Sequence, residues 1–304
     1  MNIHSFAIIG GDKRSIALAE MLVGLGHNVK MYGFTTYERE LSMQCKNLEK
    51  TIAGADYVIG PTPTSTSGGV LNAPFCHETI LVEDVFKLIK PHQLLLAGYM
   101  KPETTATAKK HNVRAIDILT REELLVLNAI PTAEGAIKIA IEETDITLHG
   151  NNMMVIGYGR IGAILCGMLR GMGANVTAVV RPGAKGALAS SVGHKAILIE
   201  DMEDRLHEAD IIFNTVPEIL LDGRNLHLIR PDTLLIDLAS PPYGIDVDAS
   251  RDLGLRVLFA NSLPGKVAPK TTAEYILSTI SNIIAEETGI SLQDCATGEC
   301  VKRL

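Results

Sequence analysis

Short apolar runs alternate with helix-length amphipathic segments along most of this 304-residue chain. Apolar runs of strand length that alternate with helical patterns are typical of parallel sheets built from βαβ units. The predicted strands lie within residues 5–12, 28–32, 55–60, 93–97 and 113–117, and then within 153–156, 175–180, 210–217, 233–240 and 257–260. A final helix from Thr271 to Glu287 carries an apolar stripe at Tyr275, Ile276, Ile280, Ile283 and Ile284.

The pattern predicts an α/β protein with two Rossmann-like domains, each with a parallel sheet, and a cleft between the domains. A chain of 304 residues is long enough for two domains with separate cores. We expect residues 1–128 to form a substrate or partner domain, with 271–304 packing back on it. Residues 129–270 then form the NAD(P)-binding domain, in the C-terminal half.

A glycine turn at residues 157–162 is the most informative motif. The apolar run Met153–Ile156 leads into Gly157-Tyr158-Gly159-Arg160-Ile161-Gly162, and a helical pattern follows at once. A dinucleotide needs this order of strand, bare turn and helix, because the pyrophosphate lies against free backbone N–H groups. We expect Gly157, Gly159, Arg160, Ile161 and Gly162 to bind the cofactor; the alternative is a glycine-rich turn of another α/β sheet.

The end of the next strand favours NADP over NAD. NAD-binding domains usually place an acid there, about 20 residues after the first glycine, to accept from the ribose 2′-hydroxyl. This chain has Val180 and then Arg181. A guanidinium can bind a 2′-phosphate, with Lys185 or Ser190 as a second contact. The alternative is a solvated arginine at a strand end.

Polar residues follow the later strands, at the sheet edge where ligands bind in open α/β folds. Thr215, Val216 and Pro217 follow one predicted strand, and Asp237, Ala239 and Ser240 close another. We assign the first three, with Asp237 and Ala239, to the cofactor site, and Ser240 to the catalytic site. For Thr215 and Ser240 the alternative is capping of a helix or loop.

Two features of the N-terminal half each allow a ligand-binding or a structural interpretation. Gly10-Gly11-Asp12-Lys13-Arg14 follows a strand but lacks the full fingerprint and has an acid where phosphate would lie, which favours a structural turn over a second cofactor site. The hydroxyl-rich loop with Thr64, Ser65, Thr66 and Ser67 can offer donors to an anion, or it is an ordinary polar turn.

Pro131 is expected near the start of a helix, which places that start at Asn128–Ile130 and the end at about Thr144. This helix is the expected connector between the domains. Beyond it, His149 is either a packing residue or a proton carrier.

Composition excludes several classes of protein. A net charge of −7 without a Lys/Arg cluster argues against nucleic-acid binding, and the absence of an apolar run near 18 residues argues against a membrane span. Five cysteines at unrelated spacings suggest reduced thiols in the cytoplasm. Cys295 and Cys300 are either a metal half-site or two idle thiols, and we expect no metal.

Together, several motifs resemble the dipicolinate synthase A-subunit family. The resemblance rests on Asn128-x-Ile130-Pro131-Thr132-x-Glu134-Gly135, Asp145-x-Thr147-x-His149-Gly150, the glycine turn, Asn214-Thr215-x-Pro217, Asp237-Leu238-Ala239-Ser240 and Leu263-Pro264-Gly265-x-Val267-Ala268-Pro269-Lys270-Thr271. It implies oxidation of a dihydrodipicolinate-type precursor to pyridine-2,6-dicarboxylate in the mother cell during sporulation. It also implies a partner, a flavoprotein-like B subunit. We further expect a homo-oligomer.

A dicarboxylate substrate calls for two groups of donors. Lys270 and Arg121 are the first candidates, as catalytic and substrate-binding residues, and Thr64–Ser67 come next. Lys270 is otherwise a solvated lysine in the first turn of a helix, and Arg121 a surface ion-pair partner of Glu122 or Glu123. No His–carboxylate pair is evident. Two other hypotheses stay open: an NADP-dependent oxidoreductase of another small carboxylate, and a non-catalytic NADP-binding subunit.

Overall fold

The chain divides into two compact units. The computed structural model describes residues 3–289 and 292, so Cys295 and Cys300 lie outside the described residues. Unit 1 combines the chain up to Leu125 with the segment from Pro269, and unit 2 holds Val126–Ala268. The substrate role expected for the first unit and the NADP-binding role expected for the second stay predictions.

Unit 1 is built on a five-stranded parallel sheet in the order β2-β1-β3-β4-β5. Its core holds Ala7, Ile9, Val58, Leu95 and Phe86, all nearly inaccessible to solvent. The strand order reverses between β1 and β3, which is where ligands bind in open sheets of this kind. The strands are β1 (Ser5–Ile9), β2 (Asn28–Tyr32), β3 (Tyr57–Ile59), β4 (Leu94–Ala97) and β5 (Arg114–Asp117); the helices are α1 (Lys13–Gly24), α2 (Leu48–Ile52), α3 (Val82–Leu88) and α4 (Pro102–Lys110), with short 3₁₀ turns η1 (Ser67–Gly69) and η2 (Ile118–Thr120).

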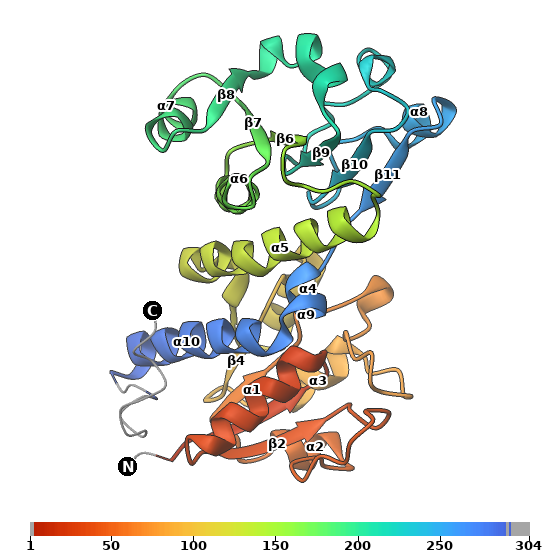
Figure 1. The fold of residues 1–304 in the computed structure, drawn as a ribbon. Coiled ribbons are helices and arrows are strands. Elements are labelled where there is room, and N and C mark those ends of the chain that lie inside the picture. The colour runs from red at the N-terminus through yellow and green to blue at the C-terminus, as the bar shows by residue number, and fades with distance from the viewer. Residues whose placement is uncertain (1–2, 290–291, 293–304) are drawn as a thin grey trace. The chain divides into compact units, whose positions relative to one another are not determined.

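The last helix, α10 (Pro269–Thr288), belongs to unit 1 although it comes last in the sequence. It lies beside α1 (Figure 1). The apolar stripe from Tyr275 to Ile284 is buried, as its helical spacing predicts. Burial of this stripe explains how a segment so far from α1 in sequence becomes part of the same unit.

Unit 2 contains a six-stranded parallel sheet in the order β11-β10-β9-β6-β7-β8. Alternate residues of β6 face two separate core clusters: Met153 and Val155 join one, and Met154 and Ile156 join the other. The sheet is therefore buried on both faces. Its strands are β6 (Asn152–Ile156), β7 (Asn175–Val180), β8 (Lys195–Leu198), β9 (Ile211–Asn214), β10 (Leu234–Asp237) and β11 (Arg256–Phe259). The helices are α5 (Glu122–Glu142), whose residues up to Leu125 belong to unit 1, α6 (Arg160–Gly171), α7 (Ala184–Ser191), α8 (Val247–Asp252) and α9 (Leu263–Val267), with 3₁₀ segments η3 (Ile199–Asp201), η4 (Glu203–Glu208) and η5 (Leu226–Leu228).

The predicted start of the connector helix was wrong. The helix α5 begins at Glu122, and Pro131 lies inside it. Proline removes one backbone hydrogen bond there, at a cost of about 3 kcal/mol. Three buried alanines offset this cost by seating the helix in the core of unit 2, Ala133, Ala136 and Ala140. Tertiary packing thus overrides the local preference of proline for a helix start.

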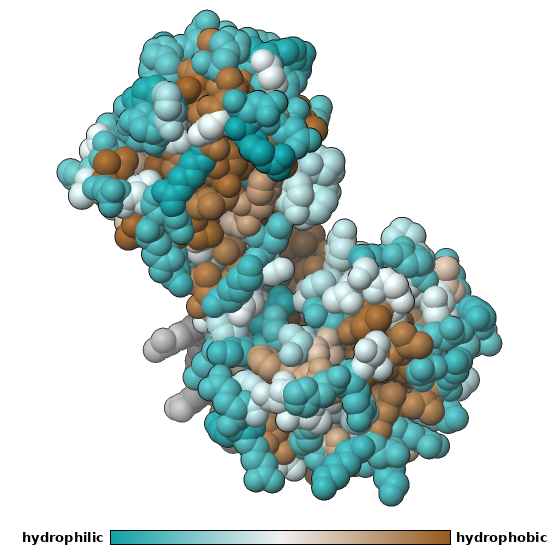
Figure 2. Space-filling view, turned by 90° about the vertical axis from the view of Figure 1, so that its right-hand side faces the viewer, coloured by the Kyte–Doolittle hydropathy of each residue, from teal (hydrophilic) through white to brown (hydrophobic). Residues whose placement is uncertain are grey.

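The helix α5 is also the one described helix with the length and apolar composition of a membrane span, at a mean hydropathy of 1.5. Its alanine face packs in the core of unit 2, as in a core helix. On the face drawn in Figure 2, hydrophilic residues cover much of the surface, and apolar residues gather in a patch on each of the two parts of the molecule. Exposed apolar residues are common on protein surfaces.

Candidate functional site

The turn between β6 and α6 has the geometry that a dinucleotide requires. Gly157 has a φ of +95°, a conformation that favours glycine. A β-carbon on Gly162 would lie 2.1 Å from the carbonyl oxygen of Gly157, so only glycine allows the helix this close to the turn. A β-carbon on Gly159, in contrast, would meet nothing within 4 Å. The open side of Gly159 leaves its backbone accessible to a ligand.

A hollow of about 290 Å³ lies over this turn, at the carboxyl edge of the unit 2 sheet. It is at the point where the strand order reverses between β6 and β9, the place where ligands bind in such sheets. Of the expected cofactor residues, it brings together Gly157, Gly159, Arg160, Ile161, Arg181, Thr215, Val216 and Pro217. Lys185, the second phosphate contact considered, also lines it.

Arg181 already has a partner. Its guanidinium forms an ion pair with the carboxylate of Glu218, and both side chains are more than half exposed. An exposed pair of this kind stabilises the fold by about 0–1 kcal/mol. A charged hydrogen bond to a ligand is worth about 1.5–3 kcal/mol, so a 2′-phosphate can displace Glu218 from the arginine. Glu218 lies 37 residues after Arg181 in sequence, and only the fold reveals the pair.

Asp237 and Ala239 do not line the hollow, and the carboxylate of Asp237 is fully buried. One carboxylate oxygen accepts from Asn214 Nδ2 and from the Ala239 amide, both at 2.9 Å; the other accepts from the Gly244 amide at 2.8 Å. Asp237 therefore fixes the segments that follow β9 and β10. Its effect on a ligand in the hollow is indirect.

The glycine turn of unit 1 differs from that of unit 2 because Asp12 occupies the start of α1. The Asp12 carboxylate accepts from the Arg14 amide at 2.9 Å and caps the helix. It also accepts from the Arg14 guanidinium at 2.9–3.1 Å. A carboxylate at this helix end takes the place of a phosphate. This arrangement argues against a second cofactor site at the turn.

The hydroxyl-rich loop uses most of its donors internally. Thr64 Oγ1 donates to the Gly98 carbonyl at 2.9 Å, and Ser65 Oγ lies 3.1 Å from Thr104 Oγ1; Thr64 and Ser65 are both buried. Thr66 Oγ1 donates to the Val70 carbonyl within the loop. These contacts fix the loop against β4 and α4. The buried hydroxyls of Thr64 and Ser65 are unsuited to an incoming anion, whereas Ser67 is exposed in η1.

Arg121 is engaged by two carboxylates of unit 1. Its Nη1 and Nη2 donate to Glu286 at 2.6 and 2.7 Å, and its Nε donates to Glu123 at 2.8 Å. The hydrogen bonds that Arg121 donates to Glu286, and then to Glu123, raise the pKa of Arg121. The arginine thus joins the end of η2 to α10. The proposed role of Arg121 in binding substrate competes with both contacts.

The other catalytic candidates lie at exposed positions. Lys270 is in the first turn of α10, and Ser240 follows β10. His149 packs on Gly173, where a β-carbon would lie 2.4 Å from the imidazole Cδ2. This contact favours the packing interpretation of His149.

Buried Cys166 has its pKa raised to about 12 by desolvation, which keeps the thiol protonated.

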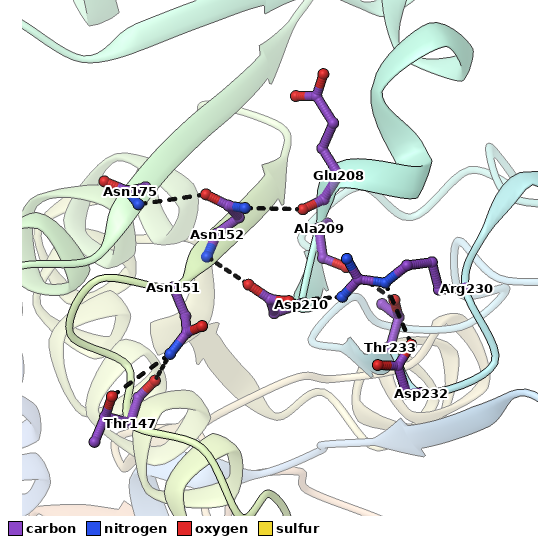
Figure 3. A network of polar contacts seen from close by, with 10 residues as sticks. All are labelled: Thr147, Asn151, Asn152, Asn175, Glu208, Ala209, Asp210, Arg230, Asp232 and Thr233. Atoms are coloured by element: carbon purple, nitrogen blue, oxygen red, sulfur yellow. Dashed lines mark hydrogen bonds and ion pairs between the residues drawn. The ribbon is translucent and has the colours of Figure 1, made fainter.

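The amino edge of the unit 2 sheet also has a hollow of about 290 Å³. Several of its polar side chains are paired, whereas the buried Nδ1 of His194 has no partner among the described residues. Figure 3 shows the network beside it, in which the Asn152 amide donates to Asp210 at 2.8 Å and Asn175 Nδ2 reaches Asn152 Oδ1 at 3.4 Å. Arg230 donates to the same Asp210 at 2.6 Å. These contacts join the starts of the strands and give this edge a structural role.

The residues around the glycine turn fit a dinucleotide. Gly159 offers a bare backbone at the start of α6, and Gly157 and Gly162 keep the turn tight. Arg181, directly after β7, and Lys185, in the first turn of α7, supply positive charge. Sequence reasoning missed Leu220 and Ile199 in the lining, because apolar residues outside a motif give no signal of their own. It also left out Tyr158, which stands at a variable position inside the glycine motif. Among the described residues, no group of three His, Cys, Asp or Glu side chains is placed to hold a metal ion.

Comparisons with known proteins agree with this geometry. Residues 5–119 match the family model for the N-terminal domain of the dipicolinate synthase A subunit. Residues 132–240 match the NAD binding domain of D-isomer specific 2-hydroxyacid dehydrogenases. Unit 2 therefore contains a nicotinamide-dinucleotide-binding domain of the dehydrogenase type.

Relatives extend the match over most of the chain. The A subunit of dipicolinate synthase from Bacillus subtilis (strain 168) is 29% identical over 283 residues, which cover 92% of this chain and 95% of that protein. The crystal structure of the dipicolinate synthase A chain from Bacillus subtilis has a TM-score of 0.85 at 28% identity, covering 95% of this chain and 98% of that one. An L-alanine dehydrogenase, at 14% identity and a TM-score of 0.65, covers 95% of this chain and 92% of its own, and shares the fold.

The resemblance to the dipicolinate synthase A subunits that the motifs predict is thus confirmed. The expected α/β class, with parallel sheets and a dinucleotide-binding domain in the C-terminal half, is confirmed as well. By sequence and by fold, this chain is a relative of the dipicolinate synthase A subunits over nearly its whole length.

Proposed function

We propose that this chain is the A subunit of a dipicolinate synthase and carries out the NADP-linked oxidation of a dihydrodipicolinate-type precursor to pyridine-2,6-dicarboxylate. The observation that carries the proposal is the hollow over the glycine turn, with Arg181 and Lys185 at its edge. The similarity to the A subunit of the Bacillus subtilis enzyme supports the substrate class. Sporulation, the cytoplasm of the mother cell, a homo-oligomer and partnership with a flavoprotein-like B subunit belong to the same proposal.

The reaction removes one hydride and one proton from a dihydropyridine ring and leaves an aromatic pyridine. When bound, the oxidised nicotinamide accepts the hydride. Aromatisation supplies driving force, so the main task of the protein is to hold and align the substrate, which contributes several kcal/mol to the rate. Exposed Lys270 and Ser67 are the candidates of unit 1 that are open to a dianion.

In this proposal, NADP is held by Gly157–Gly162 at its pyrophosphate and by Arg181 at its 2′-phosphate. No acid follows β7 to accept from the 2′-hydroxyl of NAD, since Val180 is buried and Arg181 comes next. Glu218 pairs with Arg181, which lines the hollow.

The test is to supply NADP⁺ and dihydrodipicolinate to the purified chain, first alone and then with its B subunit. We expect pyridine absorbance and NADPH to appear together in equal amounts. Formation of pyridine by the isolated B subunit, at the same rate as by the complex, would leave this chain with the non-catalytic role. Oxidation of another small carboxylate in preference to dihydrodipicolinate would replace the substrate assignment.

A further inference from the structure

The carboxyl edge of the unit 1 sheet carries a small hollow beside the glycine turn that precedes α1. It lies among residues that follow β1 and β3, and it is lined in part by Asp12, Arg14, Ser15 and Thr62. The strand order β2-β1-β3-β4-β5 reverses between these two strands. This is the position at which open α/β sheets bind their ligands.

Arg14 is the charged group of this hollow, and it is buried. Its side chain is 10% exposed, although a guanidinium in water is much better solvated. Its Nε and Nη2 donate to Asp12, and Nη2 also donates to the Thr62 carbonyl at 2.5 Å. Within the described residues, no hydrogen bond is recorded for Nη1, which keeps its two N–H donors.

A second Asp-x-Arg pair in the chain shows that the pairing does not require burial. Arg224 donates to Asp222 through the same atoms, Nε and Nη2, at 2.7–3.1 Å. The side chain of Arg224 is nevertheless 83% exposed. The ion pair with Asp12 therefore does not by itself explain why Arg14 is buried where the strand order reverses.

Two hydroxyl groups lie at the same hollow, each against a glycine. A β-carbon on Gly11 would be 2.0 Å from Ser15 Oγ, and one on Gly98 would be 2.2 Å from Thr62 Oγ1. The glycines thus allow both hydroxyls to approach the edge of the sheet closely. In the described part of the chain, neither hydroxyl has a recorded hydrogen bond.

We propose that Arg14, Ser15 and Thr62 form a binding site for one carboxylate of the small dicarboxylate substrate, an inference that rests on the proposed function. The hollow holds about 10 Å³, the space of about one water molecule. One carboxylate oxygen fits inside it, and the ring stays outside. The carboxylate takes its hydrogen bonds from Nη1 of Arg14 and from the two hydroxyls.

The Asp12 carboxylate does not prevent this, because it occupies a different edge of the guanidinium. Arg121 provides the precedent in the same unit, since it binds Glu123 through Nε and Glu286 through Nη1 and Nη2. An arginine has five N–H donors in a planar fork, enough for two carboxylates. Asp12 then orients Arg14 for the ligand.

The test is calorimetric titration of the full chain with pyridine-2,6-dicarboxylate in metal-free buffer at saturating NADP⁺. Arg14→Gln should weaken binding of the dicarboxylate about 10- to 150-fold, the loss of a charged hydrogen-bond donor. Arg14→Lys should recover part of the loss. Thr62→Val, which keeps the Asp12–Arg14 pair, should weaken binding about 2- to 10-fold.

Arg224→Gln is the matched control, because it breaks the same pair geometry at an exposed site and should leave binding of the dicarboxylate unchanged. NADPH affinity should stay within about twofold of wild type in every variant. If Arg14→Gln fails to fold, Thr62→Val decides the question alone. Wild-type binding of the dicarboxylate with no loss in Arg14→Gln or Thr62→Val would overturn this inference and leave the proposed function intact. A wild-type chain that binds NADPH but no dicarboxylate would contradict both.

Discussion

A β-carbon on Gly162 would lie only 2.1 Å from the carbonyl oxygen of Gly157. Because Gly162 has no side chain, the first turn of α6 packs directly against the turn that follows β6. Gly159, two residues after Gly157, has open space on the corresponding side. The three glycines of one motif thus serve two different purposes, tight packing and access for a ligand.

Substitution of alanine at these positions should separate the two purposes. Gly162→Ala forces the turn and α6 apart, so it should lower the melting temperature sharply. Gly159→Ala should change stability by only about 0.5–1 kcal/mol, the range for an N-cap position. It should still weaken NADPH binding at least about tenfold, because the methyl group lies where the pyrophosphate is expected. Thermal unfolding and a fluorescence titration measure the two effects; unchanged NADPH binding in Gly159→Ala would show that the ligand does not use this backbone.

Arg181→Ala should weaken the binding of NADPH about 10- to 150-fold, the loss expected for one charged hydrogen bond. NADH has no 2′-phosphate, so its affinity should change little. The ratio of the two dissociation constants is the quantity to measure. Equal losses for both cofactors would contradict the role of Arg181 as a phosphate ligand.

Glu218→Gln is the counterpart of that experiment. It removes the negative charge that pairs with Arg181 and leaves a side chain of the same size. NADPH should then bind more tightly by a few-fold, because the phosphate no longer displaces or faces a carboxylate. Tighter binding of NADH instead would mean that Glu218 acts on another part of the cofactor.

Arg121→Gln should destabilise unit 1, since it removes the contacts of Arg121 with Glu286 and Glu123. The hydrogen bond from Arg121 lowers the pKa of Glu286 below its ordinary 4.5. A carboxylate whose pKa is lower in the folded state contributes stability above its unfolded pKa, and this contribution is lost as pH falls through the folded value. The difference in melting temperature between wild type and Arg121→Gln should therefore be largest near neutral pH and shrink below about pH 4.

Catalytic measurements on the same variant distinguish a structural role of Arg121 from a role in substrate binding. If Arg121 only joins η2 to α10, Glu286→Gln should reproduce the stability loss, and both variants should keep the KM of wild type for the dicarboxylate precursor. A large rise in KM for Arg121→Gln alone would restore Arg121 as a substrate ligand.

Asp237→Ala should be among the more destabilising substitutions in unit 2. It leaves the Ala239 and Gly244 amides without their acceptor in a fully buried place, and it removes one of the two acceptors of Asn214 Nδ2, which still donates to the Val216 carbonyl. Loss of hydrogen bonds to a buried charge costs about 1.5–3 kcal/mol each in typical cases. Denaturant unfolding measures the loss, and a variant within about 0.5 kcal/mol of wild type would remove Asp237 from this structural role.

Sequence reasoning succeeded where the determining interactions are local. The strand, the glycine turn and the first turn of α6 are consecutive, so Gly157–Gly162 could be read directly. The apolar stripe of α10 likewise follows from helical spacing alone. The fold class and the dinucleotide domain depend on such local patterns, and the comparisons confirm both.

The rest could not be read from the sequence because the partners are distant in it. Glu218 meets Arg181 across 37 residues, and Glu286 meets Arg121 across 165. In the sequence alone, the hydroxyls of Thr64 and Ser65 are candidate donors to a ligand. The fold places the Gly98 carbonyl and the Thr104 hydroxyl beside them, so these hydroxyls are engaged within the protein. Pro131 fails as a helix-start signal for the same reason, since the buried alanine face of α5 is a property of the folded core.

A crystal structure of the full chain soaked with NADPH tests the central claim most directly. The account predicts density for the pyrophosphate against the backbone of Gly159 and Arg160, with the 2′-phosphate within hydrogen-bond distance of Arg181 and the carboxylate of Glu218 displaced. Density for the dinucleotide at the amino edge of the sheet, or none at saturating NADPH, would contradict it.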